Sequence, residues 1–129
     1  MDRHLHTACH QEYIEVDLMR TNFQMTDENI TMVSGDTMSY NVIIRDQNGD
    51  PVMVDGATFR AKRNLEDVTP DLSLSLNDGI TQEDEVLTVR LAPADTSSLV
   101  GFFYYDMNIT IDSDVFTLQR GMLQIEANV

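Results

Sequence analysis

Three side chains near the start of the sequence, His6, Cys9 and His10, have the types and spacing of a metal site. On a helix, residues three and four positions apart lie on one face, so the two imidazoles and the thiol could converge there. Imidazole and thiolate are ligands that zinc prefers, but a structural zinc site normally has four ligands. His4 could supply the fourth only if the segment folds back on itself. The competing interpretation is an exposed arm, free or docked on a neighbour.

Three acidic turns, at 46–50, 83–85 and 112–114, form a second group that could bind a cation. The sequence of the first turn, Asp-Gln-Asn-Gly-Asp, is superficially that of a calcium loop. Its glycine stands fourth rather than sixth, and no bidentate glutamate follows at the twelfth position. Carboxylates in β-turns mostly serve to form the turn and remain solvated. We therefore expect turn formation from these residues, with weak calcium binding as the alternative.

The sequence has no recognisable catalytic motif. It contains no glycine-rich phosphate loop, no His-Glu-x-x-His, no Gly-x-Ser-x-Gly and no Cys-x-x-Cys. A nucleophilic pair of Cys9 with a histidine would lack an orienting group and an oxyanion motif. With 22 Asp and Glu residues, some carboxylates look paired by chance. We predict that the protein is not an enzyme and needs no cofactor.

Apolar residues recur at every second position from Glu28 onward, which is the period of a half-buried strand. Turn-forming clusters separate the alternating segments, as at Asn48-Gly49, where glycine supplies a positive φ at little steric cost. The segment 92–99 breaks the pattern and predicts one helical turn or a structured corner. The ranges that alternate are 30–33, 38–45, 57–63, 72–76, 86–91, 104–111, 115–119 and 122–127.

These elements predict an all-β fold, an immunoglobulin-like antiparallel β-sandwich of about seven or eight strands over residues 28–129. Residues 1–27 form a separate N-terminal arm that contains no glycine or proline. The arm could be a helix over about 4–19, because Leu5, Cys9 and Tyr13 lie four apart, or a strand over 13–18. Both conformations stay open. Either one suits an arm that docks on, or exchanges with, a neighbouring subunit.

Composition narrows the class of partner. The chain has 129 residues and a formal charge of −14, which opposes the phosphate contacts of nucleic-acid binding and the attraction to anionic membranes. No apolar run reaches the length of a membrane span or of a signal peptide. A single cysteine excludes an intrachain disulfide framework. We expect a protein made in the cytoplasm that binds neither nucleic acid nor membrane.

Five short motifs occur in order along residues 28–129, and each has a structural interpretation. Short polar side chains such as Asp95 and Thr96 can hydrogen-bond backbone groups at a corner. In a strand, Tyr105 and Asp106 point to opposite faces. Gly121 would permit a bend or bulge between the last two strands. The motif residues are Gly35, Asp36, Thr37, Gly49, Pro51, Pro93, Asp95, Thr96, Tyr105, Asp106 and Gly121.

In this order the motifs resemble those of a family of tailed-phage and prophage structural proteins, similar to the N-terminal domain of baseplate upper proteins. Members carry a Gly-Asp-Thr turn, an Asn/Asp-Gly-x-Pro hairpin and a Leu-x-Pro-x-Asp-Thr-x-x-Leu corner. A Tyr-Tyr-Asp-Ile strand and a final Thr-Leu-x-x-Gly hairpin follow. This sequence departs from the pattern at 102–103, where two phenylalanines replace small residues, and at 112–114, which lacks a glycine. The arm, 1–27, matches nothing in the pattern.

The resemblance implies a virion structural or assembly protein, a tail or baseplate module that acts through protein–protein contacts. Its implied partners are other virion proteins and further copies of itself, and its implied location is the virion, after synthesis in the cytoplasm of the bacterial host. The alternative is a carbohydrate- or receptor-binding β-sandwich of the adhesin type, possibly calcium-dependent. That alternative needs exposed aromatic residues in loops or a bound calcium ion, and the tyrosines placed on strands weigh against it. A third hypothesis is a small metal-dependent enzyme.

Overall fold

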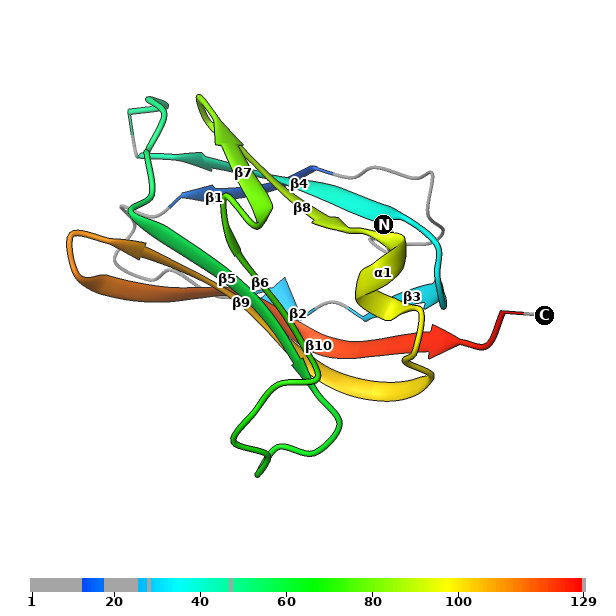
Figure 1. The fold of residues 1–129 in the computed structure, drawn as a ribbon. Helices are drawn as coiled ribbons and strands as arrows, with labels where there is room; N and C mark the ends of the chain where they lie inside the picture. The colour runs from blue at the N-terminus through cyan, green and yellow to red at the C-terminus, as the bar shows by residue number, and fades with distance from the viewer. Residues whose placement is uncertain (1–12, 18–25, 28, 47, 129) are drawn as a thin grey trace.

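Strands form almost all of the regular structure in the computed structural model, which describes residues 13–17, 26–27, 29–46 and 48–128 (Figure 1). Within these residues there are ten strands and one helical turn. They are β1 (Tyr13–Asp17), β2 (Thr26–Asp27), β3 (Ile30–Val33), β4 (Met38–Arg45), β5 (Gly56–Lys62), β6 (Leu72–Leu76), β7 (Gly79–Glu83), β8 (Val86–Leu91), α1 (Pro93–Thr96), β9 (Gly101–Ile111) and β10 (Asp114–Glu126). The all-β class expected from the sequence is confirmed.

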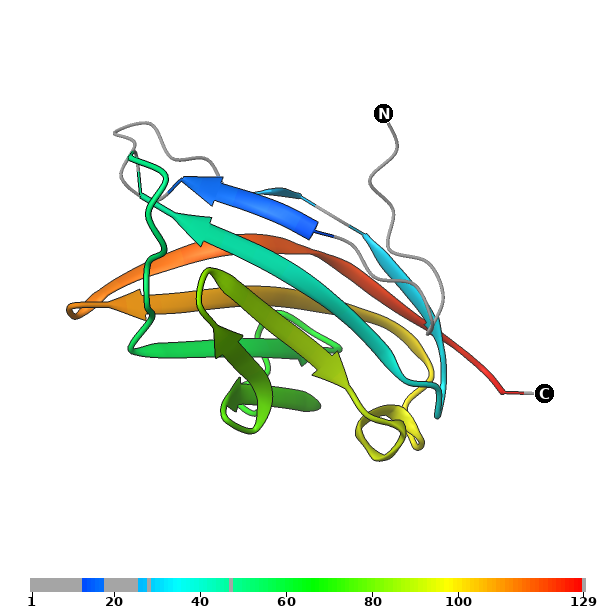
Figure 2. The same ribbon diagram turned by 90° about the horizontal axis from the view of Figure 1, so that it is seen from above.

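The strands belong to one continuous mixed sheet. Their order is β1-β4-β8-β7-β6-β5-β9-β10-β2, and β3 also pairs with β10. The sheet curls almost into a barrel, so that β4 and β8 lie over β5 and β9 with the core between them (Figures 1 and 2). The immunoglobulin-like sandwich that the sequence predicts is not confirmed, because β6 and β7 remain hydrogen-bonded through the pairs Ser75–Gly79 and Leu76–Ile80 instead of separating two sheets.

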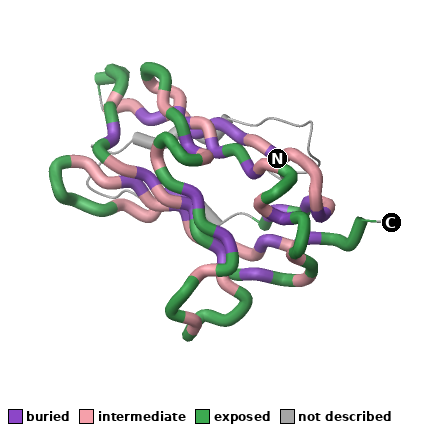
Figure 3. The backbone as a smooth tube through the Cα atoms, in the orientation of Figure 1, coloured by how far each residue is buried: buried purple, intermediate pink, exposed green. Residues whose placement is uncertain are grey.

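Alternation along the strands sets which residues form the core. In β4, Tyr40, Val42 and Ile44 are buried, as the period of two predicts. The same holds in β8, where Leu87, Val89 and Leu91 are buried and Arg90 is exposed. The buried residues lie mainly within the strands, and the residues of the turns are mostly exposed (Figure 3). The outward positions of each strand are therefore the ones available to a partner.

The end of the chain differs from the prediction. The sequence predicts two strands, over 115–119 and 122–127, with a bend at Gly121, but both ranges belong to the single strand β10. Gly121 lies inside that strand, opposite Tyr105. The irregularity is at Leu118, where the register with β9 shifts between Thr117 and Gln119. Because β9 has eleven residues, it offers β10 partners along its whole length, and a bulge absorbs the extra residue.

Several predicted turns are present. Asp112 and Ser113 connect β9 to β10 with φ angles of 50° and 75°. Two successive positive φ values are the mark of the type I′ hairpin turn, whose twist suits the flanking strands. Asn77, with φ of 70°, and Gly79, with φ of 98°, turn the chain from β6 into β7. The strand β7 itself is not among the strands that the sequence pattern predicts.

The part of the arm that the structure describes is extended. β1 pairs in parallel with β4, from Tyr13 opposite Asn41 to Asp17 opposite Arg45. Of the two conformations left open for the arm, the strand is therefore the one observed over 13–17. The two-residue strand β2 also lies within 1–27 and pairs with β10. The division into an arm and a domain at residue 27 stays a prediction.

Replacing Tyr40 by phenylalanine is expected to stabilise the protein by about 1 kcal/mol. Tyr40 is fully buried, and its hydroxyl has no hydrogen-bond partner among the described residues. Burial also raises the pKa of Tyr40 far above its usual range, so the hydroxyl stays protonated and contributes no charge. Urea unfolding of both proteins measures the difference. A loss of stability on substitution would contradict it by revealing a partner for the hydroxyl.

Candidate functional site

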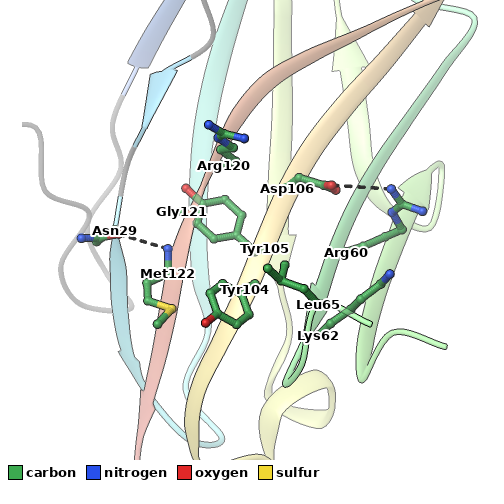
Figure 4. Close-up of a pocket in the computed structure, with 10 residues that line it drawn as sticks. All are labelled: Asn29, Arg60, Lys62, Leu65, Tyr104, Tyr105, Asp106, Arg120, Gly121 and Met122. Atoms are coloured by element: carbon green, nitrogen blue, oxygen red, sulfur yellow. Dashed lines mark hydrogen bonds and ion pairs between the residues drawn. The ribbon is translucent and has the colours of Figure 1, made fainter. Parts of the chain in front are cut away.

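The outer face of β5, β9 and β10 carries a patterned set of side chains. Strand register places Arg60, Asp106 and Arg120 side by side in one row across the three strands. The next row holds Lys62, Tyr104 and Met122. Because alternate residues of a strand share a face, both rows point away from the core. We call this surface, with the loop residue Leu65, the basic face (Figure 4).

A shallow groove of about 530 Å³ runs over the basic face. Of the described residues, three of the eight lysine and arginine residues of the chain line it, together with one carboxylate, that of Asp106. On a protein of net charge −14, this gathering of cations is unusual. The lining residues are Asn29, Arg60, Lys62, Leu65, Tyr104, Tyr105, Asp106, Arg120, Gly121 and Met122.

Hydrogen bonds fix the carboxylate in the middle of the face. The side chain of Thr117 donates to Asn108 Oδ1 at 2.6 Å, and Asn108 Nδ2 donates to Asp106 Oδ1 at 2.9 Å. The other carboxylate oxygen lies 3.6 Å from Arg60 Nη2. This chain across neighbouring strands holds Asp106 toward Arg60. The side chain of Lys62 has no such ion pair or hydrogen bond with any residue in the described part of the chain.

Aromatic side chains support the basic face from below. Phe59 and Tyr105, both buried, stack with ring centroids 5.2 Å apart. At one edge of the face, the Arg63 guanidinium lies 4.4 Å from the centre of the buried Phe103 ring and donates to the carbonyl of Val100 at 3.1 Å. Cation–π contact and stacking both resist movement of the strands. The basic face is thus a rigid surface built on strands.

The composition of the basic face is that of a binding surface. Tyrosine, methionine and arginine are enriched in the cores of protein interfaces. Tyr104 is 42% exposed and Leu65 is 68% exposed, so both are free to pack against a partner. Among the residues that the structure describes, no serine, cysteine or histidine lines the groove. The chemistry offered there is charge pairing, hydrogen bonding and apolar contact.

Two of the predicted motifs meet where α1 contacts the turn between β3 and β4. Thr96, fully buried, accepts a hydrogen bond from the Gly35 backbone N–H through its hydroxyl at 3.0 Å. The Ser34 hydroxyl donates to the Thr96 carbonyl at 2.7 Å. Asp95 accepts from the Ala92 N–H at 2.7 Å and so caps the first turn of α1. The corner predicted at 92–99 therefore locks the turn between β3 and β4, 61 residues away in sequence.

The remaining motif residues have local structural roles. Gly49, at φ of 85°, closes the turn after β4 by donating to the Asp46 carbonyl, and Pro51 bridges back to Arg45. The Asp36 N–H donates to the Val33 carbonyl. Thr37 is half-buried just before β4, and Pro93 begins α1. Among the motif residues, only Tyr105, Asp106 and Gly121 come together at the groove.

Replacing Thr96 by valine is expected to lower the free energy of unfolding by about 1–3 kcal/mol. Valine keeps the shape of threonine but leaves the Gly35 N–H without its acceptor. Ser97 to alanine, on the exposed neighbouring residue, is the matched control and should change stability by less than about 0.5 kcal/mol. Thermal unfolding of the two variants compares them. Equal, small effects would show that the junction contributes nothing to stability.

The candidate metal ligands are not placed together by the structure. His6, Cys9 and His10 lie outside the described residues. Among the residues that are described, no group of three or more His, Cys, Asp or Glu side chains could hold a metal ion. At the first acidic turn, Asp46 Oδ1 instead accepts from the N–H groups of Asn48 and Asp50, at 2.9 and 3.0 Å. The Asp46 carboxylate therefore stabilises the turn, as the sequence predicts.

Sequence reasoning missed most of the basic face. Alternation placed Arg60 and Lys62 on one face of a strand, but it gave no sign that Arg120 and Met122 lie beside them. That neighbourhood depends on the register between β9 and β10, and the bulge at Leu118 changes it. The available signal was the pair Arg60 and Lys62 at alternate positions of one predicted strand in an acidic chain.

Comparison with known proteins adds little to this description. No protein-family model matches the chain, and no curated protein matches it. A solved structure, the N-terminal domain of phage TP901-1 ORF48, is similar at 14% identity, over 91% of this chain and 99% of that one, with a TM-score of 0.37. A TM-score this low does not establish a shared fold. In the described part of this chain, no helix is long and apolar enough to cross a membrane.

Proposed function

We propose that the chain is a non-enzymatic phage or prophage virion protein, a tail or baseplate module that works through protein–protein contacts. The observation that carries the proposal is the ordered set of motifs that resembles baseplate proteins. Two of these motifs interlock through Gly35 and Thr96, and the others form turns or strands. The motif residues thus act as a framework, which is what a structural module requires.

The basic face supports the same proposal from the side of binding. It is exposed, rigid and rich in the residue types of interface cores. A virion subunit must carry such a surface for other virion proteins or for further copies of itself. The strong negative charge suits a subunit that stays soluble in the host cytoplasm until a complementary surface is met.

We further propose that these strands form an immunoglobulin-like sandwich. An immunoglobulin-like sandwich would have β1, β4, β8 and β7 in one layer and β6, β5, β9, β10 and β3 in the other. The observed neighbours follow this order, with the turn after β6 as the crossing point. The arrangement of four strands facing a sheet that contains the last two strands is that of immunoglobulin domains.

Mass spectrometry of density-banded phage particles tests the virion assignment directly. The particles are taken from the bacterium that encodes the chain, after prophage induction, and the chain should be present at a fixed ratio to the major tail proteins. Its absence from banded particles that contain the other tail proteins would refute the assignment. Tail or capsid genes on either side of the coding sequence would support it independently.

Light scattering tests the role of the arm. We expect the full chain to self-associate or to bind another virion protein, and we expect deletion of residues 1–25 to weaken that contact. β1 pairs with the edge of β4, and strand pairing of this kind can also be made between subunits. An unchanged monomer before and after deletion, with no partner captured by either form, would contradict the proposed arm function.

A carbohydrate- or receptor-binding role is the second candidate, and one observation favours it. Tyr104 is exposed within a groove that also presents Asn29 and three cations, an arrangement that could stack on and hydrogen-bond an anionic sugar. A glycan array separates the two functions. Binding to a defined glycan that is lost on replacement of Tyr104 by alanine would favour the second candidate over a purely structural module.

A further inference from the structure

The loops at one end of the molecule form an acidic surface that complements the basic face. The chain leaves β4, enters β5, turns from β7 to β8 and turns from β9 to β10 at this end (Figure 1). Hydrogen bonds connect these loops. The Gln82 side-chain amide donates to the Val52 carbonyl at 2.8 Å, and the Asp112 N–H donates to the Asp55 carboxylate at 2.7 Å. We call this surface the acidic end.

Charge is strongly one-sided at the acidic end. Among its described residues, Arg45 is the one cation, and it is bound to Glu85 by two contacts of 3.0 Å. That hydrogen-bonded pairing lowers the pKa of Glu85. Most of the other carboxylates are exposed. The acidic residues of this end are Asp46, Asp50, Asp55, Glu83, Asp84, Glu85, Asp112 and Asp114.

Exposed apolar side chains occur both at the acidic end and at the basic face. Met53 and Val115, at 59% and 68% exposure, lie at the acidic end. The other large apolar side chains that are exposed in the described residues lie on or beside the basic face and its loop. They are Leu65, Val68, Val100, Phe102 and Tyr104. Two surfaces of opposite charge, each with exposed apolar groups, therefore exist on one chain.

We infer that the basic face of one copy receives the acidic end of a second copy of this chain. The Lys62 side chain, which has no ion pair or hydrogen bond in the described part of its own chain, would pair with a carboxylate of the second copy, and Tyr104 and Leu65 would cover Met53 or Val115. Such a contact joins two different surfaces, so it builds a closed ring or an open row of subunits. The inference rests on the proposed structural function and names the surfaces that carry it.

Ionic strength gives this contact a distinctive signature. Two copies of charge −14 repel each other over a Debye length of about 30 Å at about 0.01 M salt, but only over about 8 Å at about 0.15 M. At about 0.15 M salt, the short-range ion pairs between the basic face and the acidic end are weakened less than the long-range repulsion between the two copies. Association should therefore rise from low to physiological salt and fall again at about 1 M, where pairing itself is screened.

Sedimentation velocity with charge-reversed variants tests the inference. Lys62→Glu should raise the dissociation constant by about tenfold or more, because it brings a carboxylate against the acidic end. Arg90→Glu makes the same change of charge on the exposed face of β8, away from both surfaces, and should associate like the wild type. Circular dichroism confirms that each variant is folded.

A charge swap gives the decisive comparison. The variant Arg60→Glu/Lys62→Glu has two acidic surfaces. The variant Asp50→Lys/Glu83→Lys/Asp84→Lys/Asp114→Lys has four lysines and Arg45 against four remaining carboxylates at the former acidic end, so each variant alone should remain monomeric. Their mixture should associate, because each then meets a surface of opposite charge. A wild type that is monomeric at every salt concentration, a mixture that stays apart, or equal weakening by Arg90→Glu overturns the inference. Detection of the chain in banded phage particles despite any of these results leaves the virion function standing, so the two failures are distinguishable.

Discussion

Replacing Phe59 by alanine is expected to lower the free energy of unfolding by about 3–5 kcal/mol, measured by urea denaturation. Phe59 is fully buried at the centre of β5, and its ring stacks on Tyr105 at 5.2 Å. Truncation removes the buried ring, leaves a cavity and ends the stacking contact. For a domain whose total stability is typically about 5–15 kcal/mol, this is a large fraction.

Leucine at position 59 is the matched control for this prediction. It restores much of the apolar volume but not the aromatic stacking, so its loss of stability should be clearly smaller than that of alanine. Equal losses for leucine and alanine would contradict a role for filled volume at this site.

The strands that the sequence predicted best are short and bounded by turn residues. The predicted bounds of β4, β6 and β8 are those observed. In each, apolar and polar residues alternate over five to eight positions, and glycine, proline or aspartate stands close to one end. Local chemistry decides such elements, because the inward face and the stop signals are both encoded within a few residues.

Elements that depend on distant partners were predicted less well. Gly121 suggested a break, yet β9 continues opposite it and keeps β10 straight through that position. For β1 the sequence left both helix and strand open. The strand forms because β1 pairs with β4, whose residues lie about 28 positions further along the chain. Likewise, the basic face exists only once three strands are in register. Pairing across the sheet, which no single segment encodes, decides these features.

The distribution of charge is clearer in three dimensions than in the sequence. A formal charge of −14 by itself weighs against nucleic acid and anionic membranes as partners. In the structure, eight carboxylates gather in the loops at one end, and three cations gather on the outer face of β5, β9 and β10. Net charge therefore governs repulsion at long range, whereas the local pattern governs which surfaces can meet.

Gly79 lies at the turn from β6 into β7, and replacing it by alanine is expected to cost about 2–4 kcal/mol of stability. Its φ of 98° lies in a region that side chains disfavour, and an added Cβ would stand 2.6 Å from Leu74 Cδ2. Both the backbone strain and the clash fall on the short β6–β7 junction that keeps the sheet continuous.

Gly49 provides the matched control for Gly79, because it has a similar φ of 85° but no heavy atom within 4 Å of where a Cβ would stand. Alanine at position 49 should therefore cost only the backbone strain, about 1–2 kcal/mol. The difference between the two alanine variants in thermal unfolding measures the clash with Leu74. Shortening Leu74 to alanine should reduce the cost of the Gly79 substitution and leave that of Gly49 unchanged, since only the first pair is in contact. If Gly79→Ala proved no more costly than Gly49→Ala, the tight packing that joins β6 to β7 would be refuted, and with it the physical reason for one continuous sheet.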